Sequence, residues 1–256
     1  MAEVKPYYSP GGLSAPFYDL TTALDPDLSG DVDIYARLAP EGGRVLELGA
    51  GTGRVCLALA ERGFTVVGLD LSPLMLAQAE ARRQAAPPEI AARVTLVRGD
   101  MAALSVPGPF DAIVCPYFGL AHLPAGAAWK NVFGGVAARL APGGRAAFHL
   151  PRADRLAAAP APPPDRPVLR AAFNDQGQEL LVFVHDRRVR PEIGRFDQVL
   201  DYQVRDAQGR VQASSRERLT YYAADPAPFA RSAGLEPDGD PIALGQVGDV
   251  HMFRRP

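Results

Sequence analysis

A glycine cluster between two acidic residues is the part of this 256-residue sequence that most directly indicates chemistry. Three glycines stand at every other position from 49 to 53, and they permit a tight turn and close approach of a ligand to the backbone. Amides at the start of the following helix are expected to receive an anion. A carboxylate about 20 residues further on can accept hydrogen bonds from ribose hydroxyls. The predicted site for a nucleotide-containing cofactor comprises Glu47, Gly49, Ala50, Gly51, Thr52, Gly53 and Asp70.

The elements expected to position this site alternate between strands and helices. Short apolar runs end at polar or turn residues, and helical spacing follows them. Ser72 and Pro73 form an N-cap and first-turn pair, and Gly63 is placed to end the preceding helix. Such alternation predicts a parallel sheet covered on both faces, with ligands at the carboxyl edge of its strands. The predicted strands are 44–48, 64–69, 94–97, 110–115 and 145–150, and the predicted helices begin near 52, at 73 and at 127.

The pattern changes after Leu150, where antiparallel signals replace the alternation. Residues 195–205 alternate between apolar and polar, which is typical of a strand with one exposed face. We therefore predict an α/β, Rossmann-like fold: a mostly parallel seven-stranded sheet with helices on both faces and an antiparallel β insertion after the fifth strand. The later predicted elements are a connector at 160–167, a turn at 206–209, a strand at 210–222, a helix near 226–233 and a last strand at 247–253.

We expect one domain with four parts. These parts are an N-terminal lid or helical segment (1–40), a cofactor-binding core (41–150), an antiparallel acceptor-side insertion (151–224) and the final helix and strand of the core (225–256). The length of the chain, 256 residues, suits a single elaborated α/β domain.

Charge and composition exclude several kinds of partner. Lys and Arg number 27 against 29 Asp and Glu without a run of like charge, so we expect neither nucleic acid nor a membrane as partner. Cys56 and Cys115 belong to no metal-spaced cluster, so we predict no metal. The sequence has no apolar span of membrane-crossing length and no signal-peptide core, which predicts a cytoplasmic protein. Composition leaves the oligomeric state, monomer or homodimer, open.

The residue that follows the glycine cluster distinguishes two kinds of cofactor. A dinucleotide fingerprint requires a third glycine three residues after the second, and that position holds Arg54. The glycines instead alternate, with Glu47 before them, and this pattern resembles motif I of class I methyltransferases. The resemblance implies S-adenosyl-L-methionine (SAM) as cofactor and an enzyme that methylates nitrogen, or less favourably oxygen, of a small molecule. The nearest likeness is to the glycine/sarcosine and amino-sugar N-methyltransferases.

Two other functions stay open at this point. One is an NAD(P)-dependent oxidoreductase, which Arg54 disfavours. The other is a protein that binds SAM or S-adenosylhomocysteine (SAH) without catalysis.

The resemblance also assigns roles beyond the glycine cluster. In the family, the residues after the second strand flank the adenine, an aspartate after the third strand reaches its amino group, and an aromatic motif follows the fourth strand. An N-terminal segment closes over the cofactor, and strands inserted after the fifth wall the acceptor pocket. The positions that match are Leu71, Met75, Asp100, Met101, Cys115 and Tyr117 for the cofactor, Phe118 for the acceptor, and Tyr18 in the closing segment. His149, at the end of the fifth predicted strand, and Tyr202 and Tyr222, on the inserted strands, are expected from their places in the fold to line the acceptor pocket.

Several of these residues have an equally simple structural explanation. His122 is the predicted general base or acceptor-orienting group, because an imidazole titrates near neutrality, but it could instead bond a loop carbonyl. Tyr18, together with the aromatic pair at 117 and 118, suits a sulfonium charge. His149 could be a core histidine, Asp100 could simply open a turn, and Leu71 and Met75 could be core residues. Tyr202 and Tyr222 could serve ordinary sheet packing.

Overall fold

The computed structural model describes residues 3–159 and 161–256 and divides into two compact units. The core unit comprises residues 27–152 and 222–256, and the sheet unit comprises the described residues up to 26 together with those of 153–221. The predicted connector begins at residue 160, which lies outside the described residues. That both units act as one domain with the four predicted parts remains a prediction.

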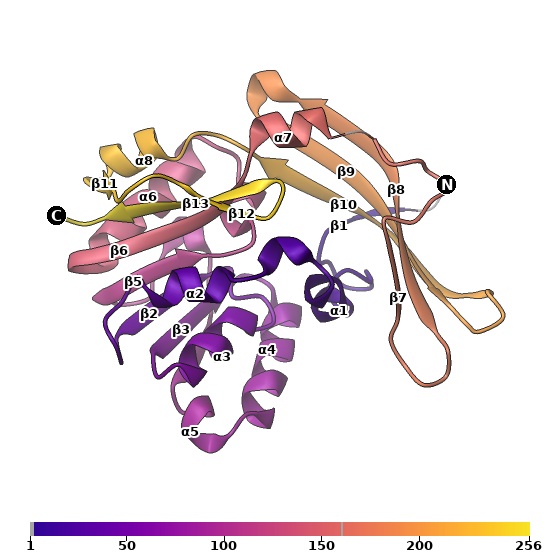
Figure 1. The fold of residues 1–256 in the computed structure, drawn as a ribbon, viewed down its shortest axis with the longest axis horizontal. Helices are drawn as coiled ribbons and strands as arrows, with labels where there is room; N and C mark the ends of the chain where they lie inside the picture. The colour runs from indigo at the N-terminus through magenta and orange to yellow at the C-terminus, as the bar shows by residue number, and fades with distance from the viewer. Residues whose placement is uncertain (1–2, 160) are drawn as a thin grey trace. The chain divides into compact units, whose positions relative to one another are not determined.

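The core unit is built on one twisted sheet (Figure 1). Seven strands follow one another in the order β11-β13-β6-β5-β2-β3-β4, and β12 pairs with β13. The five strands from β6 to β4 pair in parallel, whereas β13 runs antiparallel to β6. This arrangement confirms the predicted Rossmann-like fold. The strands are β2 (Arg44–Leu48), β3 (Thr65–Asp70), β4 (Val94–Arg98), β5 (Phe110–Cys115), β6 (Leu140–Pro151), β11 (Glu236–Pro237), β12 (Ile242–Leu244) and β13 (Gly248–Arg254).

Local sequence explains where the main helices of this unit begin. α3 follows Gly53, whose φ of 78° is left-handed, and α4 begins at Pro73, where the Ser72 hydroxyl accepts a hydrogen bond from Met75 N at 3.4 Å. No helix in the described part of the chain is long and apolar enough to cross a membrane. The helices are α2 (Asp31–Ala36), α3 (Arg54–Glu61), α4 (Pro73–Ala85), α5 (Pro88–Ala91), α6 (Ala127–Arg139) and α8 (Ala227–Ser232), with 3₁₀ turns η1 (Pro26–Leu28), η2 (Met101–Ala103) and η3 (Gly119–His122).

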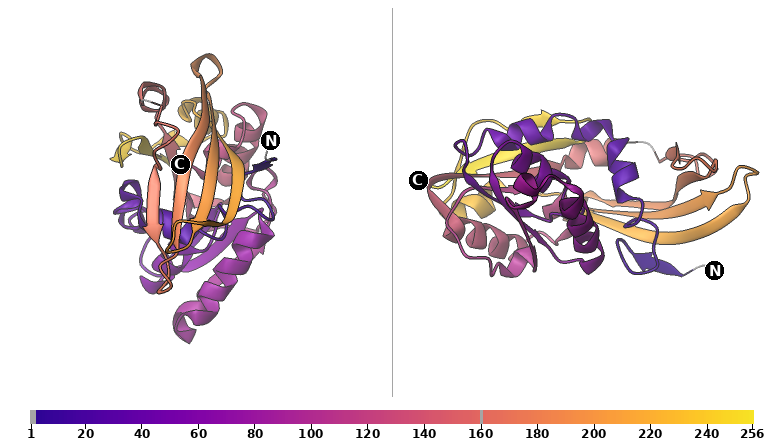
Figure 2. Two further views of the ribbon diagram at one scale, coloured as in Figure 1. Left: turned by 90° about the vertical axis from the view of Figure 1, so that its right-hand side faces the viewer. Right: turned by 90° about the horizontal axis from the view of Figure 1, so that it is seen from below.

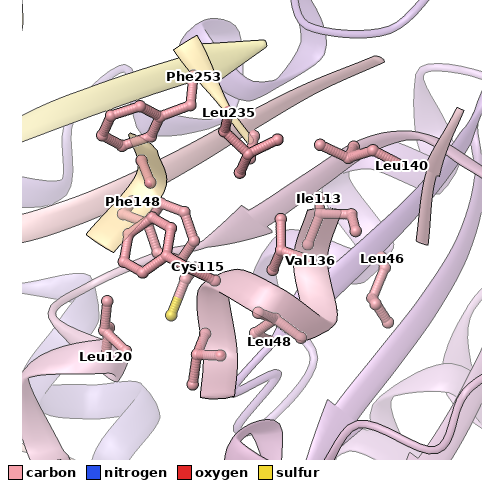
Figure 3. Close-up of a cluster of buried hydrophobic side chains, with 14 of the residues drawn as sticks. Leu46, Leu48, Ile113, Cys115, Leu120, Val136, Leu140, Phe148, Leu235 and Phe253 are labelled. Atoms are coloured by element: carbon pink, nitrogen blue, oxygen red, sulfur yellow. The ribbon is translucent and has the colours of Figure 1, made fainter. Parts of the chain in front are cut away.

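Two hydrophobic cores cover the two faces of this sheet. Successive strand residues point to opposite faces, so Leu46 packs with α6 and α8 whereas Val45 packs with α2 and α3. Figure 3 shows the first of these cores, where Phe148 and Phe253 meet across β6 and β13. Burial on both faces explains why these strands read as nearly continuous apolar runs.

The sheet unit is a five-stranded sheet in the order β1-β10-β9-β8-β7, whose strands lie side by side in Figure 2. Its predicted strands at 195–205 and 210–222 are present, and the structure adds three that the sequence did not predict. One of these, β1, pairs in parallel with β10. The elements are β1 (Val4–Pro6), α1 (Tyr18–Ala23), α7 (Ala153–Ala158), β7 (Leu169–Ala172), β8 (Glu179–Arg190), η4 (Pro191–Ile193), β9 (Arg195–Arg205) and β10 (Val211–Tyr222).

A buried carboxylate ties the N-terminal segment to this sheet. One oxygen of Glu217 accepts hydrogen bonds from Leu13 N at 2.7 Å, Ser14 N at 3.1 Å and Ser215 Oγ at 2.6 Å. The other accepts from the Ser14 hydroxyl. A buried carboxylate is stable only when donors surround it in this way, so the segment before α1 is an integral part of the sheet unit.

Two glycines of the core unit should respond oppositely to alanine. A Cβ on Gly68 of β3 would lie 2.6 Å from Cys56 Sγ and 3.0 Å from Ala50 Cβ, whereas one on Gly134 of α6 would meet nothing within 4 Å. We expect Gly68→Ala to lower the free energy of unfolding by about 1 to 3 kcal/mol through overpacking. Gly134→Ala should raise it by up to about 1 kcal/mol through helix propensity. Denaturant unfolding of both variants checks this, and equal effects would contradict the packing of α3 on β3.

Candidate functional site

The glycine cluster forms the turn between β2 and α3, at the carboxyl edge of the sheet. Gly49, Gly51 and Gly53 have φ values of 73°, 55° and 78°, a region that side chains disfavour. A Cβ on Gly49 would lie 3.4 Å from Met101 Cε and 3.9 Å from Gly119 Cα. The turn therefore faces the segments that follow β4 and β5, and three predicted parts of the site meet there.

Backbone hydrogen bonds attach this turn to the end of β3. The N–H groups of Gly49 and Ala50 both donate to the Leu69 carbonyl, at 2.8 and 2.9 Å, and Gly51 N–H donates to Asp70 Oδ2 at 2.8 Å. These three amides are already satisfied within the protein. The amides expected to receive an anion are those at the start of the following helix, α3, and that expectation stays a prediction, whereas these three turn amides are already used and do not serve a pyrophosphate.

Asp70 ends β3 with its carboxylate turned back toward this turn. Oδ2 accepts from Gly51 N, and Oδ1 accepts from Ser72 N at 2.8 Å. Partial burial raises the pKa of Asp70, and the backbone hydrogen bonds act against that rise. Each carboxylate oxygen has a second lone pair, so the partly exposed group can still accept hydrogen bonds from ligand hydroxyls.

Glu47 is the buried carboxyl of the site. It is 2% exposed, and its Oε2 has no hydrogen-bond partner among the residues described. Burial raises its pKa to about 8, while the nearby Cys56 thiol and Arg54 guanidinium act in the opposite direction. An unsatisfied buried oxygen is costly unless a ligand supplies a donor. This oxygen, beside a cradle that only glycines permit, fits a ligand that carries a hydrogen-bond donor such as an ammonium group.

The loop after β5 contains two strained residues. Tyr117 and Phe118 have φ values of 44° and 60°, and their rings stack with centroids 5.8 Å apart. Left-handed conformations cost non-glycine residues about 1 to 3 kcal/mol each and concentrate at functional sites. The loop continues into η3, which ends at the partly buried His122. Strain and position together support the predicted role of this loop.

His149 lies in the interior instead of lining an open surface. It is 0% exposed, and its ring lies 4.4 Å from that of Phe118. A Cβ on Gly248 would come within 2.3 Å of His149 Nε2, so the backbone of β13 packs directly on the imidazole. Phe118 and β13 therefore cover the imidazole of His149. An acceptor-binding role for His149 and Phe118 remains a prediction, as does every other residue role in this site.

The other predicted cofactor residues differ in exposure. Leu71 is 63% exposed beside Asp70, whereas Met75 is buried in the core unit. Asp100 accepts a hydrogen bond from Ala102 N at 2.8 Å and thereby opens η2, which is the turn role considered from sequence. Cys115 is buried, and burial raises the pKa of its thiol to about 12. Leu71 is thus accessible, whereas Met75 and Cys115 lie inside the core unit, and contact of any of the three with the cofactor remains a prediction.

Two predicted residues of the sheet unit, Tyr18 and Tyr202, contact other tyrosines of that unit. The Tyr202 hydroxyl lies 2.8 Å from that of Tyr7, and the ring of Tyr18 meets Tyr8 edge to face at 5.7 Å. Tyr222 does not line the small cavity of this unit, whereas its neighbour on β10 does, because adjacent strand residues point to opposite faces. The cavity, of about 60 Å³, is lined by Leu156, Arg187, Phe196, Gln198, Leu219 and Tyr221.

Sequence reasoning missed one charged contact beside the glycine turn. Arg54 entered only as the residue that excludes a third glycine, yet its guanidinium binds the carboxylate of Asp31 on α2. The available signal was an arginine in the first turn of a helix, where a cation is disfavoured unless a carboxylate compensates it. Within the described ranges, no three His, Cys, Asp or Glu side chains group as a metal site would require.

Comparison with known proteins agrees with this geometry. Residues 45–144 match the family model described as a methyltransferase domain. Over 140 residues, the chain is 38% identical to demethylmenaquinone methyltransferase of Thermus thermophilus, a match that covers 51% of this chain and 59% of that protein. The chain spans less than two thirds of the length of the curated relatives it matches.

Solved structures extend the likeness to the whole chain. The CcbJ methyltransferase of Streptomyces caelestis is 21% identical with a TM-score of 0.75, and the match covers 98% of each chain. The sugar N-methyltransferase KedS8 of a Streptoalloteichus species is 20% identical with a TM-score of 0.70, covering 100% of this chain and 98% of that one. These matches confirm the predicted class I methyltransferase fold, including the inserted sheet.

The buried carboxyl of Glu47 should make stability depend on pH. Because its pKa is raised from 4.5 to about 8, the neutral form stabilises the fold at low pH, and this contribution is lost as the pH rises through that range. The loss is at most about 1.4 kcal/mol per pH unit. We expect wild type to lose stability relative to Glu47→Gln between pH 5 and pH 8 in denaturant unfolding. The exposed Glu61→Gln is the control, and identical pH dependence in wild type and Glu47→Gln would contradict the assignment.

Proposed function

We propose that this chain, whose residues 45–144 form a methyltransferase domain, uses SAM to methylate nitrogen of a small-molecule acceptor. Oxygen is the second choice of acceptor atom. The family match supports methyl transfer, and the structural likeness to an enzyme described as a sugar N-methyltransferase favours nitrogen.

The observation that carries this proposal is the glycine turn held between two carboxyl groups. Glu47 offers a buried oxygen without a hydrogen-bond partner among the described residues, and Asp70 offers partly exposed oxygens at the neighbouring strand end. SAM carries an ammonium group and ribose hydroxyls, which are donors for two such acceptors. A pyrophosphate would instead find three amides of the turn already used within the protein.

The residues of the chain then need to perform little covalent chemistry of their own. When bound, SAM supplies an electrophilic methyl group on a sulfonium. Methyl transfer by in-line displacement requires mainly that the acceptor be held collinear with that group and that water be excluded. The aromatic rings of Tyr117 and Phe118, fixed by their strained backbone, are suited to contact a cation, which stabilises it by about 0.5 to 2 kcal/mol per contact.

An amine acceptor also defines a role for His122. A neutral amine attacks without a base, but an ammonium must first lose a proton. His122 is partly buried at the end of η3, which follows β5 and so lies at the same carboxyl edge of the sheet as the glycine turn. His149, by contrast, is fully buried. We assign to His122 the removal of that proton or the orientation of the amine.

Binding measurements distinguish this proposal from its two rivals. Titration calorimetry should detect SAH and not NAD, and binding of NAD alone would favour the oxidoreductase. Asp70→Ala should raise the Kd of SAH about 10-fold or more through loss of buried hydrogen bonds. The control is Asp111→Asn, at the opposite end of the strands, where the carboxylate accepts from Arg44 N. Unchanged affinity in Asp70→Ala would remove Asp70 from the site.

Turnover distinguishes an enzyme from a binding protein. With methyl-labelled SAM and a panel of amino sugars and other small amines, we expect a labelled product from wild type. His122→Ala should lower turnover about 100-fold and leave the Kd of SAH unchanged. The exposed His185→Ala is the control. Saturable SAM binding without any labelled product would favour the non-catalytic rival, and normal turnover of His122→Ala at every pH would exclude its chemical role.

A further inference from the structure

Two ion pairs connect the same two helices of the core unit. Asp31 and Asp33 on α2 bind Arg54 and Arg62, which lie at opposite ends of α3. The Asp33 and Arg62 side chains are 59% and 41% exposed, as expected of an ordinary surface pair. The Asp31 and Arg54 side chains are 2% and 27% exposed, so this second pair is largely removed from solvent.

The buried pair has the geometry of a fixed contact. Arg54 Nη2 lies 2.5 Å from Asp31 Oδ2, and Nη1 lies 3.1 Å from Oδ1, which is the paired arrangement of a guanidinium and a carboxylate. Asp31 Oδ1 also accepts from Val32 N at 2.7 Å. Removal of either partner would leave a charge in a poorly solvated place, so the pair resists separation.

The position of Arg54 connects this pair to the glycine turn. Arg54 is the first residue of α3 and follows Gly53, the last glycine of the turn. A cation in the first turn of a helix opposes the helix dipole, and the Asp31 carboxylate compensates for it. Any movement of Arg54 would move Gly53 and, through the turn, the Gly51 N–H that meets Asp70.

A buried phenol and a buried carboxyl group both respond to the charges of this pair. Tyr35, one turn after Asp31 on α2, is 0% exposed, and its hydroxyl has no hydrogen-bond partner within the described residues. Burial and the Asp31 charge raise the pKa of that phenol, and the Arg54 charge opposes the rise. Arg54 lowers the pKa of Glu47 and Asp31 raises it, so the two members of the pair act on the buried carboxyl of the site in opposite directions.

We propose that Asp31 and Arg54 are positioning residues for the cofactor: their ion pair holds the first turn of α3, and with it the glycine turn, in the shape that accepts the ligand. Neither residue is required to touch the ligand. This inference rests on the proposed SAM site. A purely structural tie between α2 and α3 is the alternative, and the Asp33–Arg62 pair provides the comparison.

The test compares matched substitutions in the two pairs. We expect Asp31→Asn to raise the Kd of SAH about 10-fold, and Asp33→Asn to leave it within about 2-fold of wild type. Calorimetry measures the Kd, and circular dichroism establishes that each variant is folded at the temperature used. In the double variant Asp31→Asn/Arg54→Gln, the loss of affinity should be smaller than the product of the two single losses, because one interaction is removed in both.

A second variant keeps the inference testable if Asp31→Asn does not fold. Arg54→Lys keeps the charge but lacks the paired donors, so it should weaken SAH binding by less than Arg54→Gln does. Lower melting temperatures with wild-type SAH affinity in the folded Asp31 and Arg54 variants would overturn the positioning role. Failure of wild type to bind SAH would instead overturn the proposed function, so the two failures are distinguishable.

Discussion

The candidate site depends on the attachment of the glycine turn to the end of β3. Two amides of the turn share the Leu69 carbonyl, and a third meets the Asp70 carboxylate. The parallel register that pairs Leu48 with Leu69 brings these groups together. Because side chains alternate along a strand, a shift of one residue would turn Asp70 away from the turn and reverse the buried faces of β3. The register between β2 and β3 therefore also fixes the positions of the groups that are proposed to bind the ligand.

The alternation of side chains along β2 also explains why the site contains a buried carboxyl group. On β2, Val45 and Glu47 point to the face covered by α2 and α3, while Leu46 and Leu48 point to the other core. A carboxyl on that face is costly when ionised, and the raised pKa of Glu47 expresses this cost. The core unit therefore retains a destabilising group where an apolar one would pack better, as proteins do at functional sites.

Local patterns in the sequence predicted several strands of both units well. The bounds of β2, β5 and β9 agree with the predicted strands, because period-two or continuous apolar runs end at turn residues. The parallel pairing of β1 with β10 was not predictable, since it joins residues more than 200 positions apart through backbone groups. That Tyr221, and not its neighbour Tyr222, lines the small cavity of the sheet unit depends on which face of β10 each residue occupies, and sequence alone does not determine this.

Arg54 illustrates a more specific limit. From sequence, its side chain only replaces a glycine and so argues against one cofactor class. In the structure, the same side chain needs an acid, and the acid comes from a short helix before β2 whose sequence has no motif of its own. Because a positive charge at the start of a helix is unfavourable, an acidic partner close in space compensates it even when that partner is distant in sequence. The need of Arg54 for an acidic partner was visible in the sequence, but only the fold identifies Asp31 as that partner.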